Sequence, residues 1–176
     1  MIKAVGQLLK NLSALLELFK EDEPALRPIR CAAIVEVVYI FGDASGSGFG
    51  SSCTEGIYFG YRFGVWNEEG DGTSSNYREC CDLVYTLKEL GRKRNLQGKE
   101  TFLCTDNMVS KIIAASGSSK LDTLFDLVVR LHCLSMRFKY NVRFIHVAGT
   151  WMISQVTDGL YRGDMYEGMM KGETIL

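Results

Sequence analysis

The chain has 176 residues, and its 20 Lys and Arg residues nearly balance 21 Asp and Glu residues, giving a formal net charge of −1. This length predicts one domain of ordinary size, since single domains commonly hold about 100 to 200 residues. The charge balance argues against a strongly basic nucleic-acid wrapper, although a local basic face could still contact phosphates.

An amphipathic helix is predicted at the start of the chain, where apolar residues recur at three- and four-residue steps from Ile2 to Phe19. Charged residues interrupt this segment, so it has the pattern of neither a secretory signal nor a membrane span. We therefore expect an intracellular protein, in the cytoplasm or nucleus, with its six cysteines reduced. Pro24 and Pro28 indicate an extended connector, and residues 1–30 are assigned to this helix and connector.

Three consecutive strands are predicted to open the main body. The apolar stretch at 32–43 indicates a buried strand, and two stretches at 48–55 and 56–67 follow, rich in aromatic residues and with glycine at hairpin positions. We expect the three strands to pair antiparallel. The first ends on Asp43, whose carboxylate loses its hydration on entering an apolar interior. Asp43 therefore needs a partner charge, hydrogen bonds or a metal.

Strands and helices alternate in the rest of the chain. The expected elements are a helix at 77–94 with Ser74 or Ser75 available as its cap, a strand at 101–106, a short helix at 107–115, a long amphipathic helix at 120–140, a strand at 141–149 and a last helix at 153–172. This order predicts an α/β fold in which helices flank a five-stranded mixed sheet. Residues 31–165 would form the main domain, and residues 166–176 a C-terminal tail.

Four acidic residues occupy positions where they could meet. Asp43 and Asp106 both end strands, and ligands of such sheets gather beyond strand ends. Glu79 lies in the first turns of the following helix, and Asp158 lies after the fifth strand. Crowded carboxylates repel each other strongly unless divalent cations neutralise them. A cluster of carboxylates alone favours Mg²⁺ or Mn²⁺, and two ions about 4 Å apart suit in-line displacement at phosphorus.

The segments that carry these acids resemble, in order and spacing, the four acidic motifs of ribonuclease H domains. They are FGDASGSGFG at 41–50, YREC at 77–80, LCTDN at 103–107 and IHVAGTWMISQVTDGLYRGD at 145–164. The retroelement reverse transcriptases carry the most similar version, and the Thr-Asp-Asn form looks most like the DIRS type within a DIRS/gypsy-like group. The resemblance covers about residues 32–163.

The resemblance implies a ribonuclease H-like fold and hydrolysis of the RNA strand of an RNA/DNA hybrid. It also implies that Asp43, Glu79, Asp106 and Asp158 act as catalytic ligands of two Mg²⁺ or Mn²⁺ ions. A reverse transcriptase polymerase domain of the same polyprotein is the partner that such a domain would accompany. The first helix lies outside the resemblance and could be a remnant of that connection or an added partner surface.

Three departures from the family pattern fall within the last motif. Ala148 stands where the turn usually has proline, Thr157 stands where alanine usually precedes the acid, and Tyr161 stands where serine is usual. These departures bear on the position of the last helix. Asp164 is therefore the alternative to Asp158 as the fourth ligand.

Candidate substrate contacts lie near the acids and in two basic segments. Small side chains around Ser45 and Gly46 would let a nucleic-acid backbone approach, and Asn76 and Asn107 could bond a 2′-hydroxyl or a base edge. The candidate phosphate contacts are Arg92, Lys93, Arg94, Arg137, Lys139 and Arg143. Asparagine is also common in turns, and cations also suit helix ends, so each residue has a purely structural alternative.

Two other functions are consistent with the sequence. One is a ribonuclease H-like scaffold that has lost activity and serves as a binding or assembly module through its first helix. The other is a nuclease of the same fold that acts on DNA, as resolvases and integrases do. His146 is a candidate general base, but its position at a strand end favours a structural role.

Overall fold

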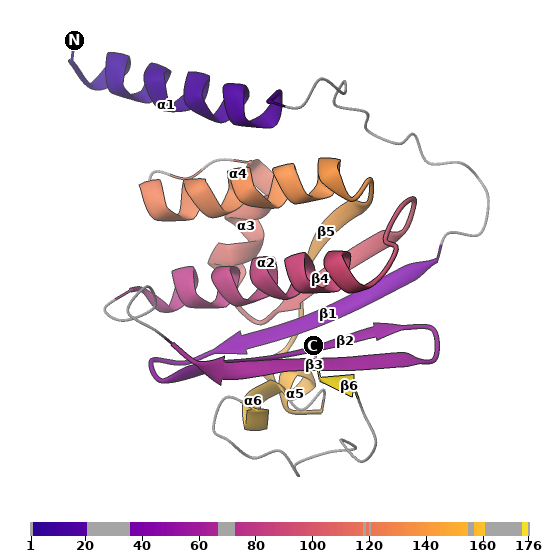
Figure 1. Ribbon diagram of the computed structural model, residues 1–176. Coiled ribbons are helices and arrows are strands. Elements are labelled where there is room, and N and C mark those ends of the chain that lie inside the picture. The colour runs from indigo at the N-terminus through magenta and orange to yellow at the C-terminus, as the bar shows by residue number, and fades with distance from the viewer. Residues whose placement is uncertain are drawn as a thin grey trace.

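A mixed β-sheet forms the centre of the protein in the computed structural model, which describes residues 2–20, 36–66, 73–117, 119, 121–154, 157–160 and 174–175. The strands are β1 (Val37–Ala44), β2 (Gly48–Glu55), β3 (Tyr58–Val65), β4 (Glu100–Thr105), β5 (Asn141–His146) and β6 (Thr174–Ile175). They lie in the order β5-β4-β1-β2-β3-β6 (Figure 1).

The strand pairing confirms the predicted five-stranded mixed sheet. β1 pairs antiparallel with β2, and β2 pairs antiparallel with β3. On its other side β1 pairs parallel with β4, which in turn pairs parallel with β5. The short β6 was not predicted and extends the β3 edge in parallel. Because β1, β4 and β5 are parallel, their carboxyl ends lie at the same end of the sheet.

The described helices flank both faces of the sheet. They are α1 (Ile2–Leu18), α2 (Ser75–Lys93), α3 (Met108–Ser116), α4 (Asp122–Arg137), α5 (Gly149–Ser154) and α6 (Thr157–Leu160). Alternate side chains of a strand point to opposite faces. Ile40 of β1 accordingly packs in the main core with Leu83 of α2, whereas its neighbour Phe41 packs with Met152 of α5. The sheet therefore has α2 on one face and α5 on the other.

Helix α2 is positioned by its cap and by its apolar side. Ser74 is the N-cap, and its side chain accepts a hydrogen bond from the backbone N–H of Tyr77. Leu83, Leu87 and Leu90 are fully buried between the sheet and α4. Burying a leucine side chain stabilises a fold by about 2 kcal/mol, so these residues anchor α2 firmly.

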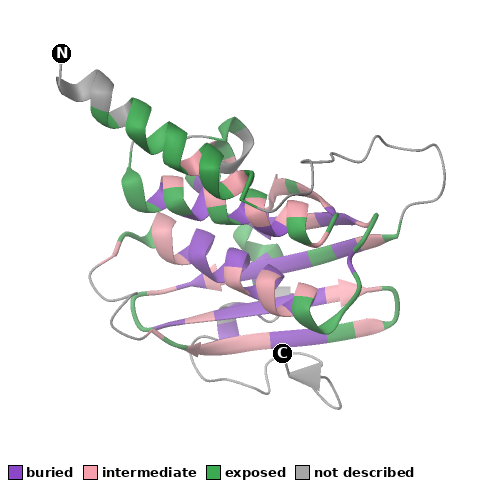
Figure 2. Cartoon of the chain, turned by 45° about the horizontal axis from the view of Figure 1, so that its top comes forward, coloured by how far each residue is buried: buried purple, intermediate pink, exposed green. Residues whose placement is uncertain are grey.

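Helix α1 is present as predicted, but its leucine-rich side faces outward. Exposed large apolar residues on it are Leu8, Leu9, Leu12, Leu15, Leu16 and Phe19. Figure 2 shows this helix largely exposed beside α4, which it contacts through an ion pair between Lys10 and Asp122. Within the described residues, none of the helices combines the length and apolar character needed to cross a bilayer.

The chain after β5 differs from the prediction. β5 ends at His146, and the Val147 N–H donates the last bond of the ladder to the Thr105 carbonyl at 2.9 Å. Because β4 also ends at Thr105, the next residues have no strand beside them, and α5 begins at Gly149 inside the segment predicted as strand. α5 and α6 replace the first part of the single helix predicted over 153–172, and the rest of that helix lies outside the described residues. The predicted strand start at 32–35 also lies outside them.

Candidate metal centre

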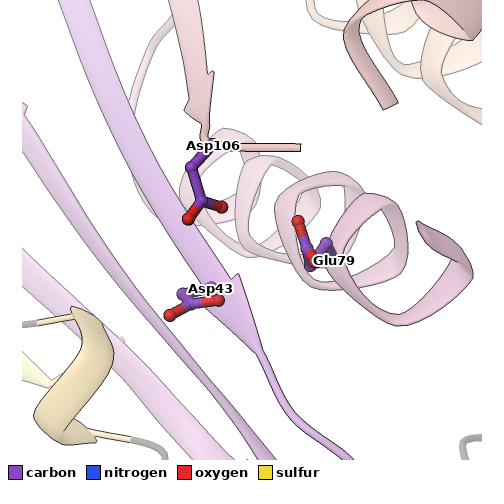
Figure 3. Close-up of side chains that lie close together, drawn as sticks. All are labelled: Asp43, Glu79 and Asp106. Atoms are coloured by element: carbon purple, nitrogen blue, oxygen red, sulfur yellow. The ribbon is translucent and has the colours of Figure 1, made fainter. Parts of the chain in front are cut away.

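Three acidic side chains meet at the carboxyl ends of β1 and β4. Asp43 lies in β1, Asp106 directly follows β4, and Glu79 lies in the second turn of α2. One carboxylate oxygen from each residue lies within 4.8 Å of the others (Figure 3). This spacing could hold a metal ion. Among the described residues, it is the one group of three or more His, Cys, Asp or Glu side chains with such a spacing.

Strand register brings the two aspartates together. Phe41 of β1 pairs with Cys104 of β4 in the parallel ladder. Asp43 and Asp106 each follow this pair by two residues, so their carboxylates emerge at the same end of neighbouring strands.

A close approach of α2 to β1 brings in Glu79. A Cβ added at Gly42 would lie 2.7 Å from Leu83 Cδ2 and 2.9 Å from Asp82 Oδ2, both on α2. The helix can therefore pack directly on the strand at the residue that precedes Asp43. One turn before Asp82, Glu79 then faces the strand ends.

The electrostatics of Glu79 reflect its burial and its acidic neighbours. Burial raises the pKa of its carboxyl group, the charges of Asp106 and Asp43 raise it further, and the result is a pKa of about 7. Hydrogen bonds from Asn107 and Thr105 oppose this rise, and the Thr105 hydroxyl lies 3.3 Å from Glu79 Oε2. A bound cation would favour the ionised carboxylate.

The donor set fits a hard divalent cation. All three ligand atoms are carboxylate oxygens, which Mg²⁺ and Mn²⁺ prefer over softer metals. Glu79 is buried, whereas Asp43 is half-buried and Asp106 is exposed. The two aspartates therefore leave the cluster open on the side from which an ion or a substrate would arrive.

The fourth predicted ligand is placed only by its backbone. Asp158 lies in α6, which packs against β1 and β2. Its side chain and the alternative ligand Asp164 lie outside the described residues. α5 also borders the cluster, since a Cβ added at Gly149 would lie 3.2 Å from Asp106 Oδ2.

The two predicted asparagine contacts lie beside the acids and bond to each other. Asn107 Nδ2 donates to Asn76 Oδ1 at 2.7 Å, and Asn107 Oδ1 caps α3 by accepting from the backbone N–H groups of Val109 and Ser110. Their positions border the cluster. Their contact with a substrate stays a prediction.

The turn after Asp43 holds the two other predicted contacts. Ser45 Oγ accepts from the backbone N–H groups of Ser47 at 3.1 Å and of Gly48 at 3.2 Å. A Cβ added at Gly46 would meet no atom within 4 Å, so the surface beside Gly46 is open.

The predicted phosphate contacts lie at the other end of the sheet. Glu79 and Arg92 are 13 residues apart in α2, which places them about 20 Å apart along the helix axis. Arg92 pairs with Glu89, Arg94 pairs with Glu55, and Lys93 is exposed. The other predicted cations are also exposed: Arg137 ends α4, Lys139 lies in the turn that follows, and Arg143 lies in β5. All six stay predicted substrate contacts.

A buried polar network one turn from Glu79 was not predicted from the sequence. Asp82 is fully buried, pairs with Arg62 Nη1 at 2.7 Å and accepts from the Ser51 hydroxyl at 2.6 Å. A signal was present, because Asp82 interrupts the buried side of the helix between Cys81 and Leu83. His146 Nε2 also lies 3.0 Å from the Asp106 carbonyl oxygen, in line with a structural role.

Comparison with solved structures shows that the chain has the ribonuclease H fold. A ribonuclease H1 isolated from compost by a metagenomic approach is 16% identical, with a TM-score of 0.54 over 74% of this chain and 98% of that one. The N-terminal ribonuclease H domain of a Mycobacterium tuberculosis protein is 15% identical, with a TM-score of 0.52 over 75% and 99% of the two chains.

The same fold occurs in ribonuclease H1 of the archaeon Halobacterium salinarum. That protein is 14% identical, with a TM-score of 0.50 over 74% of this chain and 96% of its own. No family model matches the sequence, and no curated protein matches it. The likeness therefore rests on structure.

Proposed function

We propose that the protein is a ribonuclease H of a DIRS/gypsy-like reverse-transcribing element, which cuts the RNA strand of RNA/DNA hybrids. The observation that carries this proposal is the meeting of Asp43, Glu79 and Asp106 within 4.8 Å at the ends of β1 and β4. The ribonuclease H fold and the motif resemblance support the same function.

In this proposal the chain supplies metal ligands rather than a nucleophile. Asp43, Glu79 and Asp106, with Asp158 as a fourth residue, would hold two Mg²⁺ or Mn²⁺ ions. Such ions, when bound, activate water and stabilise the leaving oxygen. Hydrolysis of this kind would give products with a 5′-phosphate and a 3′-hydroxyl. The buried Glu79 and the more exposed aspartates hold one carboxylate oxygen each within 4.8 Å of the others, so they would position the ions before the substrate arrives.

Substrate contacts would come from both ends of the sheet. Ser45, Gly46, Asn76 and Asn107 would approach the strand that is cut, where a 2′-hydroxyl distinguishes RNA from DNA. Arg92, Lys93 and Arg94 would contact phosphates farther along the duplex. A reverse transcriptase polymerase domain of the same polyprotein is the proposed partner, and the exposed apolar side of α1 is a surface that it could cover.

A catalytically inactive assembly module is the second candidate. The exposed leucine-rich side of α1 favours it, because monomeric proteins rarely leave large contiguous apolar patches in water. A cleavage assay decides between the two candidates, since such a module would bind partners or hybrids without cutting them.

The test is cleavage of a labelled RNA/DNA hybrid in the presence of Mg²⁺ by the unmodified protein, Asp43→Asn and Asp126→Asn. Asp126 is an exposed residue of α4 and serves as the matched control. We expect cleavage by the unmodified protein and the control, and a loss of at least about 100-fold in Asp43→Asn, because a metal ligand is removed.

The melting temperature of Asp43→Asn should stay the same or rise, because one of several crowded like charges is removed. Undiminished cleavage by this variant would contradict the proposed site. Faster cleavage of double-stranded DNA than of the hybrid would favour the DNA-acting alternative.

A further inference from the structure

The buried network around Asp82 joins α2 to β2 and β3. Asp82 Oδ1 accepts from Arg62 Nη1 at 2.7 Å, and Asp82 Oδ2 accepts from the Ser51 hydroxyl at 2.6 Å. Ser51 Oγ also lies 2.8 Å from the Thr86 hydroxyl oxygen, one turn farther along α2. Asp82, Ser51 and Thr86 are fully buried. Because Ser51 and Arg62 face each other across the β2–β3 ladder, the network links three elements.

Arg62 is itself held in place by aromatic contacts. Its guanidinium carbon lies 4.1 Å from the centre of the Phe49 ring and 6.0 Å from the centre of the Tyr85 ring. Cations within about 6 Å of an aromatic face are attracted to it. Phe49 of β2 and Tyr85 of α2 therefore hold the guanidinium group in addition to its ion pair with Asp82.

The network lies close to two acids of the candidate metal centre, Glu79 and Asp43. Asp82 follows Glu79 by one helical turn, so a shift of one moves the other. Asp82 Oδ2 would lie 2.9 Å from a Cβ at Gly42, the residue before Asp43. The position of Asp82 thus sets how closely the Glu79 turn approaches the end of β1.

A buried ion pair is a costly means of stabilising a fold. The desolvation of two charges offsets much of their attraction, and apolar side chains of similar volume often stabilise the protein as well or better. A buried charged network is more useful where one geometry must be selected, because its hydrogen bonds are satisfied in one arrangement only. Here the network fixes α2, which carries Glu79, against β2, which pairs with the strand that carries Asp43.

We propose that Asp82 is a positioning residue, which through Arg62, Ser51 and Thr86 fixes the spacing between the Glu79 and Asp43 carboxylates and so sets the affinity of the site for divalent cations. This inference rests on the proposed function. Asp82 itself does not bind the ion in this account. It acts through the placement of α2 on the sheet.

The experiment measures Mn²⁺ binding by calorimetry to the full chain and to four variants. Asp82→Ala removes the network, and Asp82→Ala with Arg62→Met removes it without leaving an uncompensated arginine charge. Thr86→Val removes a hydroxyl without changing charge or shape. Glu55→Gln is the matched control, because Glu55 also lies in β2 and pairs with Arg94 and Lys99 at the far end of the sheet.

We expect the Mn²⁺ dissociation constant to rise about tenfold in Asp82→Ala and to remain raised in the double variant. Thr86→Val should raise it by about threefold, and Glu55→Gln should leave it unchanged. If Asp82→Ala does not fold, the Thr86→Val result decides, since this variant keeps every charge.

Two outcomes would overturn the inference alone. One is an unchanged dissociation constant in the Asp82 variants or, if these fail to fold, in Thr86→Val. The other is full recovery in the double variant, which would show that Asp82 acts through its charge and not through position. If the unmodified protein failed to bind Mn²⁺, that result would contradict the proposed function as well as this inference.

Discussion

The two ends of the central sheet surround their glutamates with neighbours of opposite charge. At the end where β2 stops, Glu55 is surrounded by Arg94 and Lys99. Burial acts to raise the pKa of Glu55, but hydrogen bonds and charges from Lys99 and Arg94 outweigh it and hold the pKa below its ordinary value. At the other end, burial and the charges of Asp106 and Asp43 raise the pKa of Glu79 to about 7.

The difference separates a glutamate with cationic partners in the fold from a glutamate of the candidate metal centre. Glu55 has cationic neighbours from its own chain, so its ionised form is favoured by folding. Glu79 faces other carboxylates, so its ionised form becomes favourable when cations arrive from solution. Glu55 therefore belongs to a structural ion-pair site at one end of the sheet, and Glu79 to a candidate metal site at the other.

The largest expected effect is on hybrid cleavage, when the glutamate at each end of the sheet is replaced by glutamine. Glu79→Gln should lower Mg²⁺-dependent hybrid cleavage by at least about 100-fold, because it removes a metal ligand, and should leave stability equal or higher. Glu55→Gln should keep cleavage within about threefold at saturating hybrid but lower the free energy of unfolding by about 1 to 2 kcal/mol. Cleavage rates and urea unfolding of both variants check this. Lost cleavage in Glu55→Gln together with lost stability in Glu79→Gln would contradict the assignment of the two ends.

Stability of the metal-free protein should depend on pH through Glu79. Its folded-state pKa of about 7 lies above its ordinary value of 4.5, so between these values the folded protein holds a proton that the unfolded chain releases. The free energy of unfolding should therefore fall by about 2 to 3 kcal/mol as pH rises from about 4.5 to 8.

Asp82, whose pKa burial also raises to about 7 despite Arg62, adds a fall in the same direction. Urea unfolding across this pH range checks the slope, and Glu79→Gln should reduce it without abolishing it. Adding Mg²⁺ at pH 8 should restore stability to the unmodified protein. A rise in stability with pH in the absence of metal would contradict this account of Glu79.

The close packing of α2 on β1 should make Gly42 far less tolerant than Gly46. In Gly42→Ala the new methyl group would lie 2.7 Å from Leu83 Cδ2, and Leu83 is fully buried, so the helix must shift. We expect a loss of about 2 kcal/mol in the free energy of unfolding. Gly46→Ala, whose methyl group would meet open space, should change it by less than about 0.5 kcal/mol. Equal denaturant midpoints would show that α2 does not rest on β1 as described.

The smallest effect concerns the basic residues at the Glu55 end. Lys93 is exposed at the end of α2, so Lys93→Gln should weaken hybrid binding a few-fold and reduce the slope of log affinity against log salt by about one. Titrations at several salt concentrations measure this slope. An unchanged slope would indicate that the far end of the sheet stabilises the fold without contacting the nucleic acid.

Much of the fold could be predicted because its signals are local. Apolar stretches ending in Asp43 and Asp106 indicated strands, and the leucine spacing after Ser74 indicated a helix that carries Glu79. The structure brings these three acids together. The glycine-containing hairpin pattern also predicted the antiparallel pairing of the first three strands, and the order of elements predicted the mixed sheet.

Features that depend on tertiary contacts were missed. Arg62 reaches Asp82 because β2 and β3 pair in a register that sets Ser51 opposite Arg62, and no local pattern fixes that register. The start of α5 at Gly149 likewise depends on where β4 ends, since β5 loses its partner there. The roles of such residues can be identified once the pairing and register of the strands are known.

The most direct test is a crystal structure of the protein soaked in Mn²⁺, with the ions located by anomalous scattering. The account predicts two Mn²⁺ ions about 4 Å apart, bound by carboxylate oxygens of Asp43, Glu79 and Asp106. It predicts no ion beside Glu55, whose neighbours are cationic. A fully soaked crystal that holds no Mn²⁺ beside the three acids would contradict it.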